Sequence, residues 1–325
     1  RAEMKVPGRA WLEMSVRPRP GGSTYHQRAV FIPHGLPGYL YWWSVAPFHG
    51  IVFGGMVRNI TRTAERDGDV AVLTFNDPER RNAMTRAMGE AFGTAVTELA
   101  RDDSLRCVVL TGAGRAFCAG GDLGMIQDQT DAGRADPGAA RRGIRDTMRS
   151  FYGLFLSVRA IACPTVAALN GAAVGAGLCV ALACDMRIAS EVAKLGLNFT
   201  RLGLHPGMGA TWTLPRLVGP AHAAELLYTG RTLTGAEAAR IGLVNRAVPA
   251  AEVLPAAQEL AREIAAAAPL ANRGVKRALA RSAGVTLDDQ LDFEADVQAE
   301  TFASEDAREG LAAARGRRAP KFSGH

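Results

Sequence analysis

Two glycine-rich segments, Gly114–Leu123 (GRAFCAGGDL) and Asn170–Gly177 (NGAAVGAG), decide the fold. Each directly follows a short apolar run, Cys107–Thr111 (CVVLT) in the first case and Thr165–Leu169 (TVAAL) in the second. Such runs are typical of buried strands, and small residues after a strand let the backbone approach a ligand closely. In the second segment a helix is expected from about Gly175. Its first N–H groups would be unpaired at the positive end of the helix dipole, where a developing negative oxygen is stabilised.

Either segment alone is weak support for a site, since neither is a Walker or Rossmann fingerprint. The flanking sequence alternates short apolar runs with helical spacing, which predicts an α/β fold with a parallel-rich core. After Pro249 no strand signal remains, so a helical C-terminal region is expected. The remaining expected elements are strands at Val70–Phe75 and Met186–Ala189, helices at Thr85–Ala100 (Thr85 as the cap) and Gly175–Ala183, and C-terminal helices at Ala251–Ala268, Leu270–Ala283, Leu287–Phe302 and Glu305–Ala314.

Residues 1–55 differ in character from the rest of the chain. They hold nine of the 21 aromatic residues and six of the 16 prolines, with no helical or strand period. We interpret 1–55 as an irregular extension that need not belong to the native protein, 56–250 as the core, and 251–325 as a helical oligomerisation region. The apolar stretch 39–55 raises a membrane reading, but Pro47 and His49 interrupt it, so membrane contact is not favoured.

Charge and cysteine usage exclude several classes of protein. Residues 1–55 carry six basic and two acidic side chains of a chain with net charge +6, so the rest is nearly neutral and no nucleic-acid partner is expected. The cysteines are odd in number and lack zinc-knuckle spacing, so no metal site is predicted and reduced thiols in a cytoplasmic protein are expected. They are Cys107, Cys118, Cys163, Cys179 and Cys184.

Five segments, in order, together resemble the crotonase (enoyl-CoA hydratase/isomerase) family over about Val57 to Phe322. They are Phe75–Met84 (FNDPERRNAM), similar to N-R-P-x-x-x-N-A-[LM]; Phe117–Leu123, similar to F-x-A-G-x-D-L; Asn170–Gly177, similar to N-G-x-x-x-G-[GA]-G; Leu202–Gly209, similar to L-G-x-x-P-x-x-G; and Tyr228–Val244, similar to T-G-x-x-x-x-A-x-E-A-x-x-x-G-L-V.

The resemblance implies a crotonase-like spiral of ββα units with a helical C-terminal region, assembled as a homotrimer or a dimer of trimers. It implies an acyl-CoA thioester substrate of fatty acid metabolism, with coenzyme A as part of the substrate and no separate cofactor. By position, the backbone N–H groups of Ala119 and Ala176 should form an oxyanion hole. Other residues that should bind the substrate or its coenzyme A are Arg80, Arg81, Ala83, Gly120, Gly121, Asp122, Leu123, Gly175, Lys276 and, more weakly, Lys321.

The sequence departs from the family pattern at both catalytic glutamates. Cys179 and Phe199 stand at those positions. A thiol with its ordinary pKa of about 8.5 is largely neutral, and an apolar side chain in a helix is the plain interpretation of Cys179. His205 titrates in a suitable range, although a structural role in its turn is favoured. Weaker candidates are Asn198 for orienting water, and the acids Asp122, Asp185 and Glu191.

Several functions stay open. One is an enoyl-CoA hydratase or isomerase-like enzyme that stabilises a thioester enolate, with an acid supplied by an Asp122–Asp128 loop or by a neighbouring subunit. Another is an acyl-CoA decarboxylase, which needs no base because the carboxylate itself leaves. A third is a catalytically silent acyl-CoA-binding homologue, and a fourth is a membrane-associated variant through residues 39–55.

Overall fold

The computed structural model describes the chain except residues 1, 7, 20–21, 34–60 and 136, and the chain divides into two compact units, Arg1–Val57 and Arg58–His325. The stretch 39–55 therefore lies outside the described residues. Among the residues that are described, no helix combines the length and hydropathy needed to cross a bilayer.

The first unit contains an antiparallel three-stranded sheet in the order β1-β2-β3. The sequence pattern indicated no strand here, and the structure differs. Prolines obscured the pattern, but Pro18 and Pro33 lie at or near strand ends, where a missing N–H is tolerated. The strands are β1 (Ala2–Val6), β2 (Gly8–Arg19) and β3 (Gly22–Pro33).

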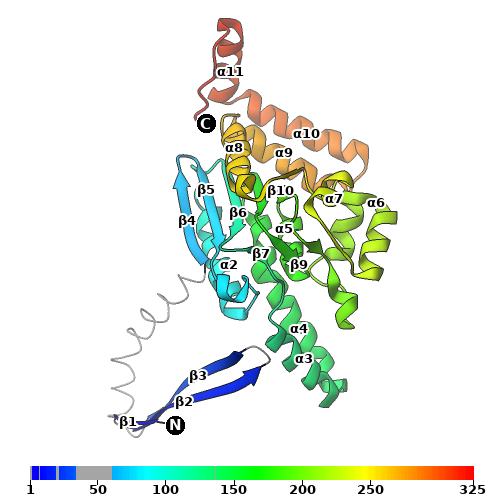
Figure 1. Cartoon of the computed structure of the whole chain (residues 1–325). Helices are drawn as coiled ribbons and strands as arrows, with labels where there is room; N and C mark the ends of the chain where they lie inside the picture. The colour runs from blue at the N-terminus through cyan, green and yellow to red at the C-terminus, as the bar shows by residue number, and fades with distance from the viewer. Residues whose placement is uncertain (1, 7, 20–21, 34–60, 136) are drawn as a thin grey trace. The chain divides into compact units, whose positions relative to one another are not determined.

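The second unit is built on a six-stranded sheet in the order β13-β10-β8-β6-β5-β4 (Figure 1). All neighbouring pairs are parallel except β4 with β5. The four strands predicted from apolar runs are confirmed, and the two edge strands β4 and β13 were not predicted. The strands are β4 (Thr61–Asp67), β5 (Val70–Phe75), β6 (Cys107–Gly112), β8 (Thr165–Leu169), β10 (Met186–Ser190) and β13 (Arg246–Val248).

A smaller sheet, in the order β12-β11-β9-β7, lies beside the first. Each of β6, β8 and β10 is followed by a short strand of the smaller sheet and then by a helical segment, so the chain winds as repeated ββα units. This confirms the spiral predicted from the family resemblance. The short strands are β7 (Ala116–Cys118), β9 (Ala172–Val174), β11 (Leu195–Gly196) and β12 (Thr232–Leu233).

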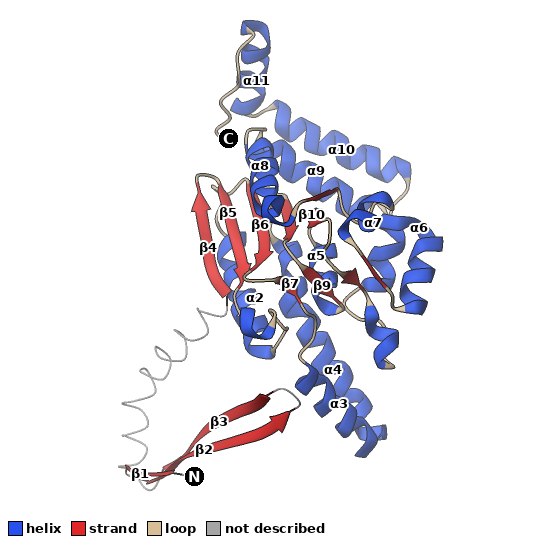
Figure 2. Ribbon diagram, in the orientation of Figure 1, coloured by secondary structure: helices blue, strands red, loops and turns tan. Residues whose placement is uncertain are grey.

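The helices divide between the spiral and the C-terminal region (Figure 2). The expected α2 is confirmed with its cap, because Thr85 Oγ1 accepts the Met88 N–H at 3.1 Å, and the four C-terminal helices are confirmed. The helices α3, α4, α6 and α7 were not predicted, and the expected Asp122–Asp128 loop is instead the start of α3. The helices are α2 (Arg86–Ala100), α3 (Leu123–Ala135), α4 (Pro137–Leu156), α5 (Ala176–Ala183), α6 (Ala210–Thr229), α7 (Gly235–Arg240), α8 (Val253–Ala265), α9 (Pro269–Ser282), α10 (Leu287–Phe302) and α11 (Glu305–Gly316), with 3-10 turns η1 (Pro78–Arg80), η2 (Ser157–Ala160), η3 (Asn198–Leu202) and η4 (Ala250–Glu252).

Both faces of the central strands β5, β6 and β8 are buried, which explains why these strands are continuous apolar runs. On one face Val72, Val109 and Val166 pack against Val253 and Ala257 of α8. On the other face lies the larger core, where β5, α2, β7 and α4 contribute aromatic rings whose centroids are 5.0–6.5 Å apart. The rings are Phe75, Phe92, Phe117, Phe151 and Phe155.

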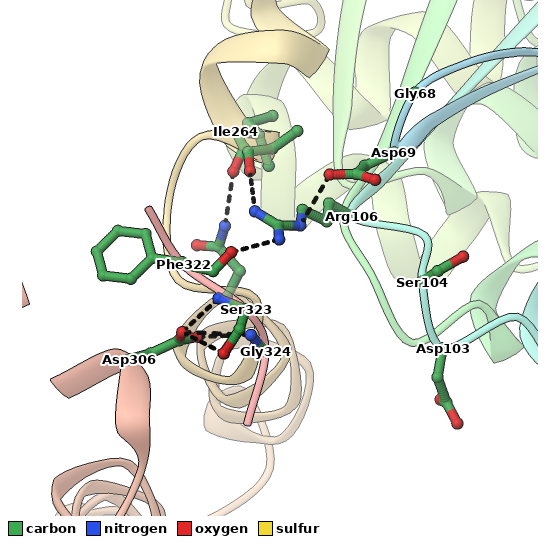
Figure 3. A network of polar contacts seen from close by, with 12 residues as sticks. Gly68, Asp69, Asp103, Ser104, Arg106, Ile264, Asp306, Phe322, Ser323 and Gly324 are labelled. Carbon is green, nitrogen blue, oxygen red and sulfur yellow. Dashed lines mark hydrogen bonds and ion pairs between the residues drawn. The ribbon is translucent and has the colours of Figure 1, made fainter. Parts of the chain in front are cut away.

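Partly buried polar contacts fix the end of the chain to this body (Figure 3). Arg106 pairs with Asp69 at 3.1 Å and donates to the backbone carbonyls of Ala265 and Phe322. Asp306 is 3% exposed and accepts the N–H groups of Ser323 and Gly324. Hydrogen bonds to charged groups are stronger than those between neutral groups, so the C-terminal segment forms part of the folded unit.

Candidate active site

The first glycine-rich loop joins β7 to α3, and its hydrogen bonds decide which N–H groups face a ligand. The Ala119 N–H donates to Arg81 O at 3.0 Å, so it is not free to bind a thioester oxygen. Here the structure differs from the prediction that Ala119 supplies one oxyanion donor. The reason is that residues 119–122 run alongside the Arg81–Met84 segment. Hydrogen bonds to that segment use the Ala119 N–H, the Gly120 carbonyl and the Asp122 N–H.

The Gly121 N–H points the other way. Gly120 O accepts the Met84 N–H at 2.8 Å, and the Asp122 N–H donates to Met84 O at 3.1 Å. In a trans peptide the C=O and N–H point in opposite directions, so the Gly121 N–H is directed away from Met84. It has no hydrogen-bond acceptor among the described residues.

The second loop joins β9 to α5 and presents the Ala176 N–H in the same manner. Gly175 O accepts the Cys179 N–H at 3.2 Å in the first turn of the helix. The N–H of the same peptide, on Ala176, therefore points out of the helix N-terminus, where backbone donors lack intrahelical partners. Gly175 has φ +53° and ψ −123°, a conformation open to glycine.

The two loops are in direct contact. A methyl group built on Gly120 would lie 2.6 Å from Val174 O and 3.6 Å from the Ala176 nitrogen. Gly120 also has φ +93°, so only glycine suits the position sterically and conformationally. This close approach brings the peptide that precedes Gly121 next to Ala176.

Gly177 makes the second close approach between the loops, and its replacement by alanine is expected to lower the free energy of unfolding by about 2 kcal/mol through overpacking. The added methyl would lie 2.5 Å from Cys118 O and 2.8 Å from Cys118 Sγ, both fixed by β7. Gly143→Ala is a matched control, because Gly143 is an exposed α4 position with open space around it. Urea denaturation that gives equal stabilities for the two variants would contradict the contact.

The two positions of the family glutamates hold no acid. Cys179 is 2% exposed, its Sγ is 3.7 Å from Gly207 O, and burial raises its pKa to about 12. It is therefore a neutral thiol at ordinary pH. Phe199 is half-buried on η3 and packs against the core. Asn198 beside it is also half-buried, and its Oδ1 would lie 3.2 Å from a methyl group on Gly175.

The remaining predicted acids have other partners or lie at the surface. Asp122 Oδ1 accepts the Met125 N–H at 3.1 Å and caps α3, which fits the structural interpretation of this residue. Asp185 accepts both the N–H and the hydroxyl of Thr165. Asp128 and Glu191 are exposed, as is Leu123 of the first loop, at 68%.

The candidate coenzyme A-binding cations differ in whether they already have a partner within the protein. Arg80 pairs with Asp77 at 3.0 Å, whereas Arg81 is exposed beside it. Lys276 is engaged: its Nζ lies 2.9 Å from Asp185 Oδ2 and donates to Cys163 O at 2.9 Å. The structure thus gives Lys276 partners of its own, unlike the predicted role on coenzyme A. The half-buried Ala83 belongs to the Arg81–Met84 segment that pairs with the first loop. His205 and Lys321 lie at the surface, and no contact among the described residues joins them to either loop.

Sequence reasoning missed Tyr152, which reaches the site from α4. A methyl group built on Gly207 would lie 2.5 Å from the Tyr152 hydroxyl, so this hydroxyl lies against the same glycine that Cys179 contacts. The ring is half-buried, and burial, followed by the neighbouring Cys179, raises the pKa of Tyr152. No motif marks this residue. Only a prediction of helix α4 from the sequence could have pointed to it.

All five thiols are expected to be unreactive in the folded protein. Burial raises the pKa of Cys107, Cys118, Cys179 and Cys184 to about 12, and raises that of Cys163. Ellman's reagent at pH 8 should therefore titrate none before denaturation and five after it. The thiols lose their protons at lower pH in the unfolded chain than in the folded one, so their contribution to the free energy of unfolding falls as the pH rises from about 9 towards 12. Labelling of Cys179 in the native protein at pH 8 would contradict the expectation that the folded thiols are unreactive.

The geometry combines a spiral of ββα units with two abutting backbone turns whose free N–H groups belong to Gly121 and Ala176. No group of three or more potential metal-ligating side chains occurs within the described part of the chain. The arrangement is suited to polarising an oxygen of a bound ligand through backbone donors. It defines the crotonase class of protein.

Comparisons with known proteins agree with this class. Residues 65–325 match the family model described as enoyl-CoA hydratase/isomerase, and residues 1–56 match one described as protein of unknown function (DUF2867). The chain therefore belongs to the enoyl-CoA hydratase/isomerase family. It is 37% identical to the 1,2-epoxyphenylacetyl-CoA isomerase of Escherichia coli, over 78% of this chain and 95% of that protein.

Two further relatives show the same relationship. The short-chain-enoyl-CoA hydratase of Clostridium acetobutylicum is 35% identical, over 77% of this chain and 92% of that protein. The crystal structure of enoyl-CoA hydratase from Bacillus anthracis superposes with a TM-score of 0.74 at 34% identity, over 82% of this chain and all of that one. The family acts on acyl-CoA thioesters.

Proposed function

We propose that this protein is an enzyme that binds an acyl-CoA thioester and stabilises its enolate with the N–H groups of Gly121 and Ala176. The observation that carries the proposal is the pair of outward N–H groups on two loops in contact. Negative charge develops on the thioester oxygen when the acyl chain becomes enolate-like. One preorganised backbone donor in a dry site contributes about 3 kcal/mol to lowering such a barrier.

The polar side chains around the second loop favour a reaction that needs no carboxylate base. Cys179 is a neutral thiol and Phe199 is apolar. Asp122 caps α3, and Asp185 is bonded to Thr165 and Lys276. Hydration requires a group that removes a proton from water, and a neutral thiol is a poor one. Decarboxylation of a malonyl-type thioester requires none, because loss of CO₂ leaves the electron pair on the enolate. We therefore favour an acyl-CoA decarboxylase over a hydratase.

Substrate binding and assembly complete the proposal. Arg81 is an exposed cation next to the first loop and suits a coenzyme A phosphate, with Arg80 beside it. Exposed apolar side chains on α9 and α10 support assembly into a homotrimer or a dimer of trimers, with Leu279 70%, Leu287 72% and Phe302 74% exposed.

The purified full chain tests the reaction class. Malonyl-CoA and methylmalonyl-CoA would be assayed for release of labelled CO₂, and crotonyl-CoA for loss of the enoyl-thioester absorbance. The proposal predicts CO₂ release with little hydration. Rapid hydration of crotonyl-CoA would contradict the base-free reaction, and tight acyl-CoA binding without turnover on any of the three would favour the silent homologue.

A further inference from the structure

Tyr152 has a side chain that can donate a proton, and the mechanism proposed above gives it no role. It comes from α4, and its hydroxyl lies against Gly207, whose carbonyl is 3.7 Å from Cys179 Sγ. No hydrogen-bond acceptor for this hydroxyl is recorded among the described residues. Burial raises the pKa of Tyr152, so the phenol stays protonated at neutral pH.

Through Gly207 the hydroxyl is placed near Cys179, which lies one helical turn from the second proposed oxyanion donor. Cys179 follows Ala176 by three residues, which is about 4.5 Å along a helix axis. In a thioester whose oxygen accepts the Ala176 N–H, the acyl α-carbon is two covalent bonds beyond that oxygen. The α-carbon would therefore lie on the side of α5 where Cys179 and Tyr152 meet.

The surroundings of this hydroxyl are largely apolar, because Tyr152 packs against the main core and Cys179 beside Gly207 is 2% exposed. Phe199 of η3 lies near the start of α5, with its ring 4.0 Å from a methyl group built on Gly175. Water is a poor proton source in such surroundings, and the one neighbouring thiol is held neutral by burial. A half-buried phenol has one face towards the core and one towards solvent, which lets it exchange its proton after each cycle.

We propose that Tyr152 is a catalytic residue that delivers a proton to the α-carbon of the thioester enolate. The inference rests on the proposed function. In the decarboxylation, the bond between the α-carbon and the carboxylate breaks, CO₂ leaves, and the electron pair enters the enolate. The Tyr152 O–H bond then breaks, its proton forms the new C–H bond at the α-carbon, and the phenolate takes a proton from water.

The test compares the full-length protein with Tyr152→Phe, which keeps the ring and removes the hydroxyl. In D₂O with methylmalonyl-CoA, the wild-type protein should give α-deuterated propionyl-CoA of one handedness. The variant should turn over about 100-fold more slowly, the scale of general acid catalysis, and give a product of mixed handedness. Tyr228→Phe is the matched control, because Tyr228 is 82% exposed, and it should match wild type in both readouts.

A second variant moves the hydroxyl instead of deleting it. Gly207→Ala adds a methyl group 2.5 Å from the Tyr152 oxygen, and it should lower the rate and the stereospecificity in the same direction. A Tyr152→Phe variant with wild-type rate and handedness overturns the inference while leaving the proposed function in place. A wild-type protein that releases no CO₂ contradicts the proposed function itself.

Discussion

Proline at position 176 is expected to lower turnover of the acyl-CoA substrate by about 100-fold or more, with little change in stability. Proline has no N–H, so the variant lacks one of the two proposed oxyanion donors. Loss of one such donor typically raises the barrier by about 3 kcal/mol. Ala176 is the first residue of α5, a position where proline is well tolerated, and Gly175 before it is in a conformation that only glycine adopts easily. Steady-state rates for the two proteins make the measurement.

Ala176→Ser is the control for the side chain, because it alters the residue and keeps the N–H. Its rate should remain within a few-fold of wild type. Circular dichroism and the thermal midpoint show whether the proline variant is folded. A folded proline variant with wild-type turnover would remove the Ala176 donor from the mechanism.

Asn82→Ala is expected to lower the free energy of unfolding by about 4 kcal/mol. Asn82 is fully buried, and its Nδ2 donates to the carbonyls of Ala113, Ala116 and Phe117 at 2.8–3.2 Å. Its Oδ1 accepts the Asp77 N–H at 2.8 Å. Alanine leaves these groups in the interior without a partner, and each unsatisfied group costs about 1–3 kcal/mol.

Asn245→Ala is the control, because it removes an asparagine side chain that is not buried. Asn245 is exposed, and its side chain accepts one hydrogen bond, from the Arg187 N–H. Water can replace it, so a loss below about 1 kcal/mol is expected. The free energies of unfolding from urea titration make the comparison. Equal losses in the two variants would contradict the structural role given to Asn82.

The strands of the main sheet could be predicted because both of their faces are buried. Val70–Phe75 and Thr165–Leu169 are uninterrupted apolar runs for that reason. The pair α3–α4 could not, since Leu123–Ala135 mixes exposed polar residues with scattered apolar ones, and Pro137, the first residue of α4, interrupts the pattern. The three strands of the first unit were missed because prolines broke the apparent pattern.

The two loops were located from sequence, but the direction of each peptide was not. The motif indicates that small residues form the loop. From the sequence alone, Ala119 and Gly121 are equally plausible as the oxyanion donor. Only the bonds to Arg81 and Met84 separate them. Lys276 is a similar case, because its pairing with Asp185 joins residues 91 positions apart and leaves no local signature.

The most direct test of the central claim is the infrared stretching frequency of a bound thioester carbonyl labelled with ¹³C, measured with butyryl-CoA. Two N–H groups on one oxygen weaken the C=O bond. The account predicts a frequency in the wild-type complex well below that of free butyryl-CoA. In the Ala176→Pro variant saturated with butyryl-CoA, the frequency should return towards the free value. An unshifted carbonyl in the wild-type complex, or the same shift in both proteins, would contradict it.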